Sequence, residues 1–212
     1  MKVHPLASVL AGLARLISGA NARWLDCEPS LRQRVYFANH TSHLDFVVLW
    51  ASLPPEVRAR TRPVAARDYW EKGRLRRLLA QDVFRAVLIE RDFARATPGE
   101  GMTAARSLMD RLVEALGEES SLILFPEGTR GSGEQVGAFR SGLYHLCRRM
   151  PGLELVPVYM ENLNRILPKG EVLPVPLLSS VTFGPPMQLA EGEDKREFLE
   201  RARQALVKLR PQ

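Results

Sequence analysis

The sequence predicts a single α/β domain with a mostly parallel central sheet flanked by helices, and a short amphipathic helix at its N-terminus. Strand-like apolar runs alternate with helix-like segments, which is the order of a parallel sheet built from βα units. Polar clusters directly follow several of these runs, as side chains at the carboxyl edge of such a sheet do. A chain of 212 residues, of which 45% are hydrophobic and 25% charged, has the size and composition of one ordinary globular domain.

Residues 1–24 form an amphipathic segment ahead of the predicted domain. Its apolar side chains recur at helical spacing: Leu6, Val9, Leu10, Leu13, Leu16 and Ile17. The run spans about sixteen residues and contains Arg15, so it is too short and too interrupted to cross a bilayer. It either lies in the membrane interface, with Lys2, Arg15, Arg23 and Trp24 near the head groups, or packs on the domain. Composition alone favours packing on the domain.

The remaining elements follow in βα order. Strands are expected near residues 34–38, 62–66, 86–90, 121–125, 153–160 and 179–184, and helices near 43–53, 68–80, 102–116, 139–149 and 193–210. Pro54-Pro55 and the stretch from Pro168 to Pro186 are expected to be loops. The chain contains no internal repeat and no low-complexity tract.

The chain is basic, with a net charge of +6, and 25 of its 30 basic residues are Arg. An excess of Arg suits phosphate or anionic-lipid contacts, although a bias in nucleotide composition explains it equally well. Cys27 and Cys147 stand alone without a CxxC motif, and no cleavable signal peptide is evident. These features indicate a reducing, cytosolic setting.

The polar turn at residues 39–45, between a strand-like and a helix-like segment, is the first candidate site. His40 and Asp45 can meet only if His40 lies in the entering loop and Asp45 in the first helical turn. The carboxylate would then fix the tautomer of the imidazole and leave its other nitrogen free as a base. Two other interpretations are open: a structural His–Asp contact, or a metal site built from His40, His43 and Asp45. A metal site lacks a further His or Cys cluster, and HExxH is absent.

Three more polar clusters follow predicted strands: Arg67-Asp68, Glu90-Arg91-Asp92 and the run from Pro126 to Gly131. In the last of these, Gly128 and Gly131 bracket Thr129-Arg130, so the backbone can turn sharply and Arg130 offers a fork for a phosphate. A loop closed by a salt bridge is the alternative explanation of that cluster.

Together these residues resemble the glycerolipid acyltransferase family, of the lysophosphatidate acyltransferase type. The run from Asn39 to Asp45 matches its NHxxxxD motif, and Phe125 to Gly131 matches its FPEGTRG motif. Weaker similarity lies at Ile89-Glu90-Arg91, at residues 139–142 and at residues 156–158, so the resemblance runs from about residue 35 to 160. The chain departs from the family where it has Arg67 in place of a frequent Lys, Arg85 in place of a common Gly, and only a short N-terminal stripe.

The resemblance implies an acyltransferase domain over residues 25–212 and a pair of catalytic residues, His40 as the base and Asp45 as its partner. It implies an acceptor site for the phosphate and glycerol end formed by Arg91, Glu127, Gly128, Thr129 and Arg130. Arg67 or backbone amides are candidates for the oxyanion donor. Because no GxSxG elbow is present and neither cysteine has a nucleophile context, direct attack by the acceptor hydroxyl is expected.

The resemblance also implies the partners. They are a lysophospholipid acceptor, most often 1-acyl-glycerol-3-phosphate, an acyl-CoA or acyl carrier protein as co-substrate, and a membrane surface. No metal, resident cofactor or nucleic acid is expected. The expected place is peripheral, on the cytoplasmic side of a bacterial membrane. Two alternatives remain: a metal-dependent hydrolase, and a non-catalytic protein that binds anionic lipid.

Overall fold

The computed structural model describes residues 5–42, 45–90, 98–131, 133, 135–161 and 179–211. Within these residues, seven strands form one sheet in the order β1-β7-β6-β2-β5-β3-β4. The strands are β1 (Asn21–Trp24), β2 (Arg34–Ala38), β3 (Thr61–Ala66), β4 (Val87–Ile89), β5 (Ser121–Leu124), β6 (Glu154–Glu161) and β7 (Ser180–Phe183). Every neighbouring pair is parallel except β6 and β7. The predicted α/β class with a mostly parallel sheet is therefore confirmed.

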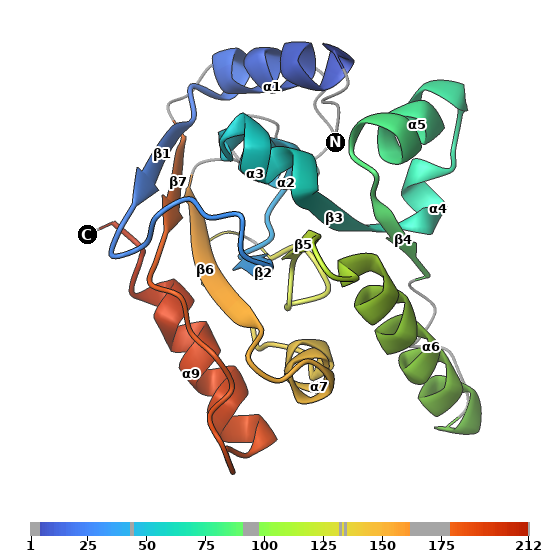
Figure 1. Ribbon diagram of the computed structural model, residues 1–212, viewed down its shortest axis with the longest axis vertical. Helices are drawn as coiled ribbons and strands as arrows, with labels where there is room; N and C mark the ends of the chain where they lie inside the picture. The colour runs from blue at the N-terminus through green and yellow to red at the C-terminus, as the bar shows by residue number, and fades with distance from the viewer. Residues whose placement is uncertain are drawn as a thin grey trace.

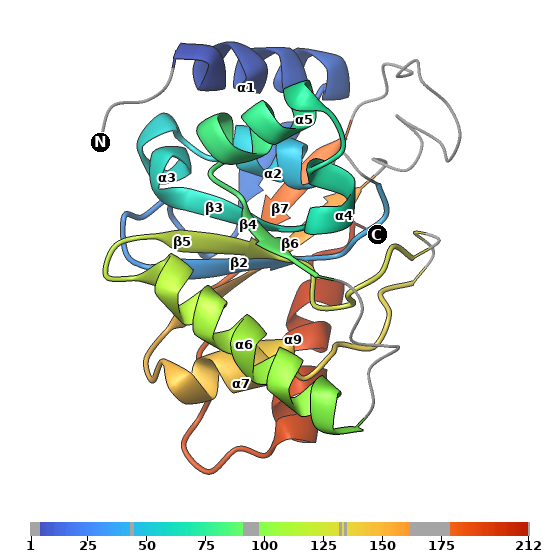
Figure 2. The same ribbon diagram turned by 90° about the vertical axis from the view of Figure 1, so that its right-hand side faces the viewer.

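Helices cover both faces of the sheet (Figures 1 and 2). One face carries α1 (Pro5–Ser18), α2 (Asp45–Ser52), α3 (Pro55–Arg60), α4 (Arg67–Trp70) and α5 (Arg74–Leu78), and the other carries α6 (Pro98–Leu116), α7 (Gly142–Arg149) and α9 (Lys195–Val207). Each face has its own apolar core.

The central strand β2 supplies both cores. All five of its residues are buried. Tyr36 and Ala38 belong to the core under α1 and α2, whereas Val35 and Phe37 belong to the core under α6, α7 and α9. This alternation follows from the two-residue period of a strand, and it explains why β2 reads as an unbroken apolar run.

Three parts of the chain differ from the sequence prediction. The helix expected over 68–80 is interrupted: α4 ends at Trp70, α5 begins at Arg74, and a π-helical turn follows at Leu79–Val83. Gly73 has φ +90°, which a continuous helix cannot contain. The strand β1 was not predicted, and Pro55 begins α3 where a loop was expected, because proline suits the first turn of a helix. Residues 168–178 of the predicted loop lie outside the described residues.

The N-terminal helix packs on the domain and also keeps an apolar outer face. Ala7 and Ala11 are buried against the core, while Val9, Leu13 and Leu16 are 57%, 48% and 79% exposed. Arg15 turns inward and donates to the carbonyl oxygens of Ala51 (2.6 Å) and Leu53 (3.2 Å) at the end of α2.

Arg15 is hydrogen-bonded to the end of α2 and yet exposed as a whole residue, so its place near lipid head groups stays a prediction. Trp24 stacks on Phe183 of β7, with ring centroids 3.9 Å apart. Lys2 lies outside the described residues. No described helix combines the length and hydropathy that crossing a bilayer requires.

Candidate active site

The predicted site lies at the carboxyl edge of the sheet, where β2, β5 and β3 end side by side. These three strands are parallel neighbours, so the turns that follow them project from the same edge. The turn after β2 begins at Asn39. The turn after β5 begins at Phe125.

His40 and Asp45 are in contact, as the sequence analysis expected of a loop residue and the first residue of α2. His40 Nδ1 lies 2.8 Å from Asp45 Oδ2. The backbone N–H groups of Thr41 (2.5 Å) and Ser42 (2.8 Å) donate to the same oxygen. Asp45 is completely buried, whereas the His40 side chain is 20% exposed. With its proton on Nδ1 and facing the carboxylate, the imidazole keeps the Nε2 lone pair available.

Two further contacts hold the His40 turn in place. Its ring stacks on Phe125, the first residue after β5, at a centroid distance of 4.3 Å and an angle of 22°. Asn39 donates to the carbonyl oxygen of Met160 and accepts from the Met160 N–H, both at 2.8 Å. The side-chain amide of Asn39 thereby binds Met160 as a backbone peptide group would, and it extends the pairing of β2 with β6 by one residue.

Glu127 connects the two turns. Its Oε1 accepts from the His40 N–H (2.9 Å) and its Oε2 from the Gly137 N–H (2.8 Å). The N–H of Gly131 donates to the His40 carbonyl oxygen (2.8 Å), so both backbone polar groups of His40 are bound by the second turn or its carboxylate. We expected Glu127 on the acceptor. In this arrangement each of its oxygens accepts one backbone N–H.

The exposed part of the second turn is Gly128, Thr129 and Arg130. Gly128 has φ +71°, and a Cβ there would lie 2.5 Å from Nε of Arg140. Arg140 packs beneath the turn and donates from Nε to the Glu127 carbonyl oxygen (3.3 Å) and from its backbone N–H to Pro126 (2.8 Å). Within the described part of the chain the Arg130 guanidinium binds no hydrogen-bond acceptor and stands at the edge of the site.

Comparison with known proteins identifies the family of the chain. Residues 27–161 match the family model described as Acyltransferase. The chain belongs to the acyltransferase family. It is 30% identical over 183 residues to a 1-acyl-sn-glycerol-3-phosphate acyltransferase of Limnanthes douglasii, an alignment covering 84% of this chain and 59% of that protein. It is 26% identical over 150 residues to a Dictyostelium discoideum protein named taffazin, covering 68% and 50% of the two chains.

The chain thus spans 59% of the length of the Limnanthes douglasii relative. Its fold is similar to the crystal structure of the 1-acyl-sn-glycerophosphate (LPA) acyltransferase PlsC from Thermotoga maritima, with a TM-score of 0.67. The similarity covers 95% of this chain and 78% of that one at 18% sequence identity, so it establishes a shared fold.

Two of the predicted residues of the acyltransferase, Arg91 and His43, lie outside the described residues. Arg67 follows β3 at the same edge as His40. Its Nη1 pairs with Glu71 at 2.9 Å, and its Nε lies 3.9 Å from Glu90 of the neighbouring strand end. Among the described residues no group of three His, Cys, Asp or Glu side chains is placed to hold a metal ion.

Neither cysteine of the chain is placed to act as a nucleophile. Burial raises the pKa of Cys147 to about 12 and also raises the pKa of Cys27. Both thiols are therefore protonated at neutral pH. Both are also buried and free of disulfide bonds.

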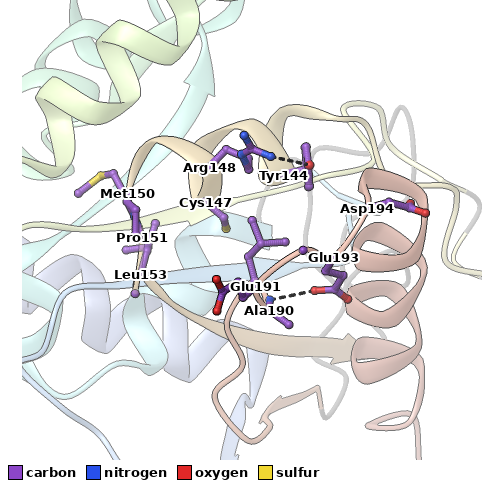
Figure 3. A pocket seen from close by; sticks show the side chains of 13 residues that line it. Tyr144, Cys147, Arg148, Met150, Pro151, Leu153, Ala190, Glu191, Glu193 and Asp194 are labelled. Atoms are coloured by element: carbon purple, nitrogen blue, oxygen red, sulfur yellow. Dashed lines mark hydrogen bonds between the residues drawn. The ribbon is translucent and has the colours of Figure 1, made fainter.

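A cavity of 580 Å³ lies away from the catalytic turns, between the end of α7, residues 150–153 ahead of β6, and the loop before α9 (Figure 3). Two of its polar side chains, Arg148 and Glu193, are bound to the protein itself. Arg148 donates to the Tyr144 hydroxyl, and Glu193 accepts from the Ala190 N–H and from Arg201. This cavity lies at the amino end of β6, and we assign it no part in the reaction.

Proposed function

We propose that this protein transfers a fatty acyl chain from a thioester donor to the free hydroxyl of 1-acyl-glycerol-3-phosphate, giving phosphatidic acid. The observation that carries the proposal is the His40–Asp45 pair, with Nδ1 bound to a buried carboxylate and Nε2 without a partner among the described residues. The names of the plant relatives support the choice of acceptor, and membership of the acyltransferase family supports the reaction. The donor is acyl-CoA or an acylated carrier protein.

The proposed reaction is a direct displacement. The acceptor hydroxyl gives its proton to His40 Nε2 as its oxygen attacks the thioester carbonyl. Asp45 stabilises the imidazolium that forms. When the tetrahedral intermediate collapses, the carbon–sulfur bond breaks, the thiolate takes the proton back from His40, and the ester remains. Because burial keeps both cysteines protonated, we assign no acyl-enzyme to the pathway.

We assign the phosphate of the acceptor to the exposed second turn. Arg130 is unpaired among the described residues, and a guanidinium binds a phosphate through two parallel hydrogen bonds. Gly128 and Thr129 shape the same turn. Arg67 remains our candidate for the oxyanion donor, and Arg91 a second candidate for the phosphate. Glu127 acts through His40: it holds the backbone of the base, so we class it as a positioning residue.

We further propose that the protein works at the cytoplasmic surface of a bacterial membrane, with the outer face of α1 in the interface. Val9, Leu13 and Leu16 are exposed on this face, and an acceptor with one acyl chain resides in a bilayer. The double change Leu13→Ser/Leu16→Ser should reduce sedimentation with vesicles and leave the fold intact, because both side chains already face solvent. Equal sedimentation of the variant and the wild type would refute this placement.

The experiment that tests the function is an assay of the purified protein with acyl-CoA or acylated carrier protein and a panel of lysophospholipids. Mass spectrometry should detect phosphatidic acid as the main product. The same assay with a chelator distinguishes a metal-dependent hydrolase, because that enzyme would release free fatty acid and lose activity. Vesicle binding without any acylated product would instead identify a non-catalytic lipid-binding protein.

A further inference from the structure

A short basic segment, residues 72–78, has no role in the proposed reaction or in the proposed membrane contact of α1. It contains four cations, Lys72, Arg74, Arg76 and Arg77, and two leucines, within seven consecutive residues that are all exposed. Leu75 is 69% exposed and Leu78 is 43% exposed. A cluster of cations with two exposed leucines in so short a run is a surface that no described residue of the chain covers.

The segment faces outward because its two ends are anchored. Before it, Trp70 packs edge-on against Phe46, with centroids 5.2 Å apart, and against Phe84 at 5.9 Å. After it, the π-helical turn leads to Phe84, which packs on Phe46 at 5.1 Å. Gly73, with φ +90°, turns the chain between these anchors. Leu75 and Leu78 therefore cannot reach the core without moving the aromatic cluster.

The positive charge of the segment is not neutralised by the groups around it. Glu71, the nearest carboxylate in sequence, pairs with Arg67. Arg77 donates to the Glu71 carbonyl oxygen at 3.3 Å, and Arg76 lies over the Tyr69 ring at 4.4 Å, contacts that leave both guanidinium charges in place. In the described part of the chain none of the four cations forms an ion pair.

The segment also lies at the same end of the molecule as α1. Both views place α5 and α1 on the same side of the sheet, toward the upper end of the molecule (Figures 1 and 2). The outer face of α1 is apolar, with Val9, Leu13 and Leu16 exposed, whereas the segment is cationic. An apolar strip next to a cationic strip matches the cross-section of an anionic bilayer, whose acyl region lies beneath negatively charged head groups.

We propose that residues 72–78 form a second membrane contact, in which the four cations bind anionic lipid head groups and Leu75 and Leu78 enter the interface. The proposal rests on the proposed function in that the acceptor lies in the bilayer. Two contacts, α1 and this segment, fix the orientation of the protein on the surface, which a single helix cannot do. The exposed leucines and the neighbouring apolar face favour a bilayer over an acidic protein as the partner.

The test compares two variants that lose the same charge. Arg74→Gln/Arg77→Gln removes two cations from the segment. Lys195→Gln/Arg196→Gln removes two exposed cations from the start of α9, at the opposite end of the molecule. Each cation near an anionic surface contributes about fivefold to binding, so the first variant should bind phosphatidylglycerol-containing vesicles about thirtyfold more weakly. The α9 variant should bind like the wild type. On phosphatidylcholine vesicles the two variants should bind equally.

A second pair of variants tests the contribution of the exposed leucines to vesicle binding. Leu75→Ser should weaken binding to both kinds of vesicle, whereas Leu31→Ser, at a residue that is 50% exposed between β1 and β2, should not. Vesicle binding is measured without substrate, so it fails or succeeds independently of the acyltransfer assay. Wild-type binding by Arg74→Gln/Arg77→Gln, or an equal loss in the α9 variant, would overturn the proposal. So would unchanged vesicle binding with a raised KM for an acylated carrier protein, which would assign the segment to an acidic protein.

Discussion

The amino and carboxyl edges of the sheet are formed by the same strands but differ in how completely their polar groups are paired. At the amino edge, Arg34 at the start of β2 donates to Glu154 at the start of β6 (2.8 Å) and to the Glu28 carbonyl oxygen (2.7 Å), while its backbone N–H donates to Ser121. At the carboxyl edge, polar groups that follow β2 and β5 are also bound, but within the described residues His40 Nε2 and the Arg130 side chain have no hydrogen-bond partner. Polar groups that are fully paired stabilise a fold, whereas open groups on a rigid frame are available to a substrate.

The largest expected effect tests the open nitrogen. His40→Ala should lower kcat by about 10²–10⁴-fold, the usual contribution of a general base. Asp45→Asn should also be severe, because an amide no longer fixes the tautomer or stabilises the imidazolium. The measurement is single-turnover acyl transfer together with the urea midpoint of unfolding. His43→Ala is the matched control and should be mild. If it were as damaging as His40→Ala and zinc copurified, a metal site would replace the catalytic pair.

The next largest effect tests the open arginine. Arg130→Ala should lower kcat/KM for lysophosphatidate by about 10²-fold, as expected when a charge-assisted hydrogen bond is lost. Arg130→Lys should remain impaired, because an ammonium cannot reproduce the bidentate contact. Steady-state kinetics with lysophosphatidate and lysophosphatidylcholine separate the two acceptors. Equal losses on both would show that Arg130 does not bind the terminal phosphate.

A smaller effect is expected at Glu127, whose two oxygens already accept backbone hydrogen bonds at the carboxyl edge. Glu127→Gln places an amide NH₂ against one of the two N–H donors it now accepts from. The His40 backbone should therefore shift. As a result kcat should fall about tenfold, with the KM of both substrates little changed. Gly137→Ala is a second route to the same shift, since a Cβ there would lie 2.9 Å from Glu127 Oε2. A rise in the acceptor KM at constant kcat would instead place Glu127 on the substrate.

The smallest effect on rate is expected at the amino edge. Glu154→Gln should leave kcat unchanged and cost about 1–2 kcal/mol of unfolding free energy, because Arg34 keeps a hydrogen bond but loses the opposite charge. Burial alone would raise the pKa of Glu154, but hydrogen bonds from Arg34 and Arg32 outweigh burial and hold the pKa below its ordinary value.

The sign of the pH dependence follows from this lowered pKa. A carboxyl whose pKa is lower in the folded protein stabilises the fold above its unfolded pKa, and that stabilisation is lost as pH falls through the folded value. The difference between wild type and Glu154→Gln should therefore be largest near neutral pH and shrink below about pH 4. Urea unfolding across that range measures it. A difference that grows on acidification would contradict the assignment.

The contact between His40 and Asp45 could be predicted from the sequence because its geometry is local. A strand, a turn and a helix start within seven residues leave few ways for His40 and Asp45 to meet. The role of Glu127 could not be predicted in the same way, because one of its partners is the Gly137 N–H, a backbone group in a loop ten residues away. Backbone donors have no signature in a sequence. The family-like block at residues 139–142 was the available signal for Arg140, although its position beneath Gly128 required the fold.

The elements that escaped prediction depend on tertiary partners. Asn21–Trp24 is four residues long and becomes a strand by pairing with Ser180–Phe183. Arg15 reads as a charge on an amphipathic helix, and only the end of α2 makes it an inward hydrogen-bond donor. The break at Gly73 did have a local signal, since glycine is the residue that most readily ends a helix with φ above zero.

The pairing of β1 with β7 has a consequence for synthesis of the chain. Asn21 and its partner Ser180 are separated by about 160 residues, so at ordinary translation rates β1 waits on the order of ten seconds or more for β7, its neighbour in the described sheet. During that interval α1 has already emerged from the ribosome, whereas β7, the strand with which β1 pairs, has not yet been synthesised. Closure of the sheet is thus among the last events of folding, and the nascent chain presents its apolar N-terminal helix long before the active-site edge is complete.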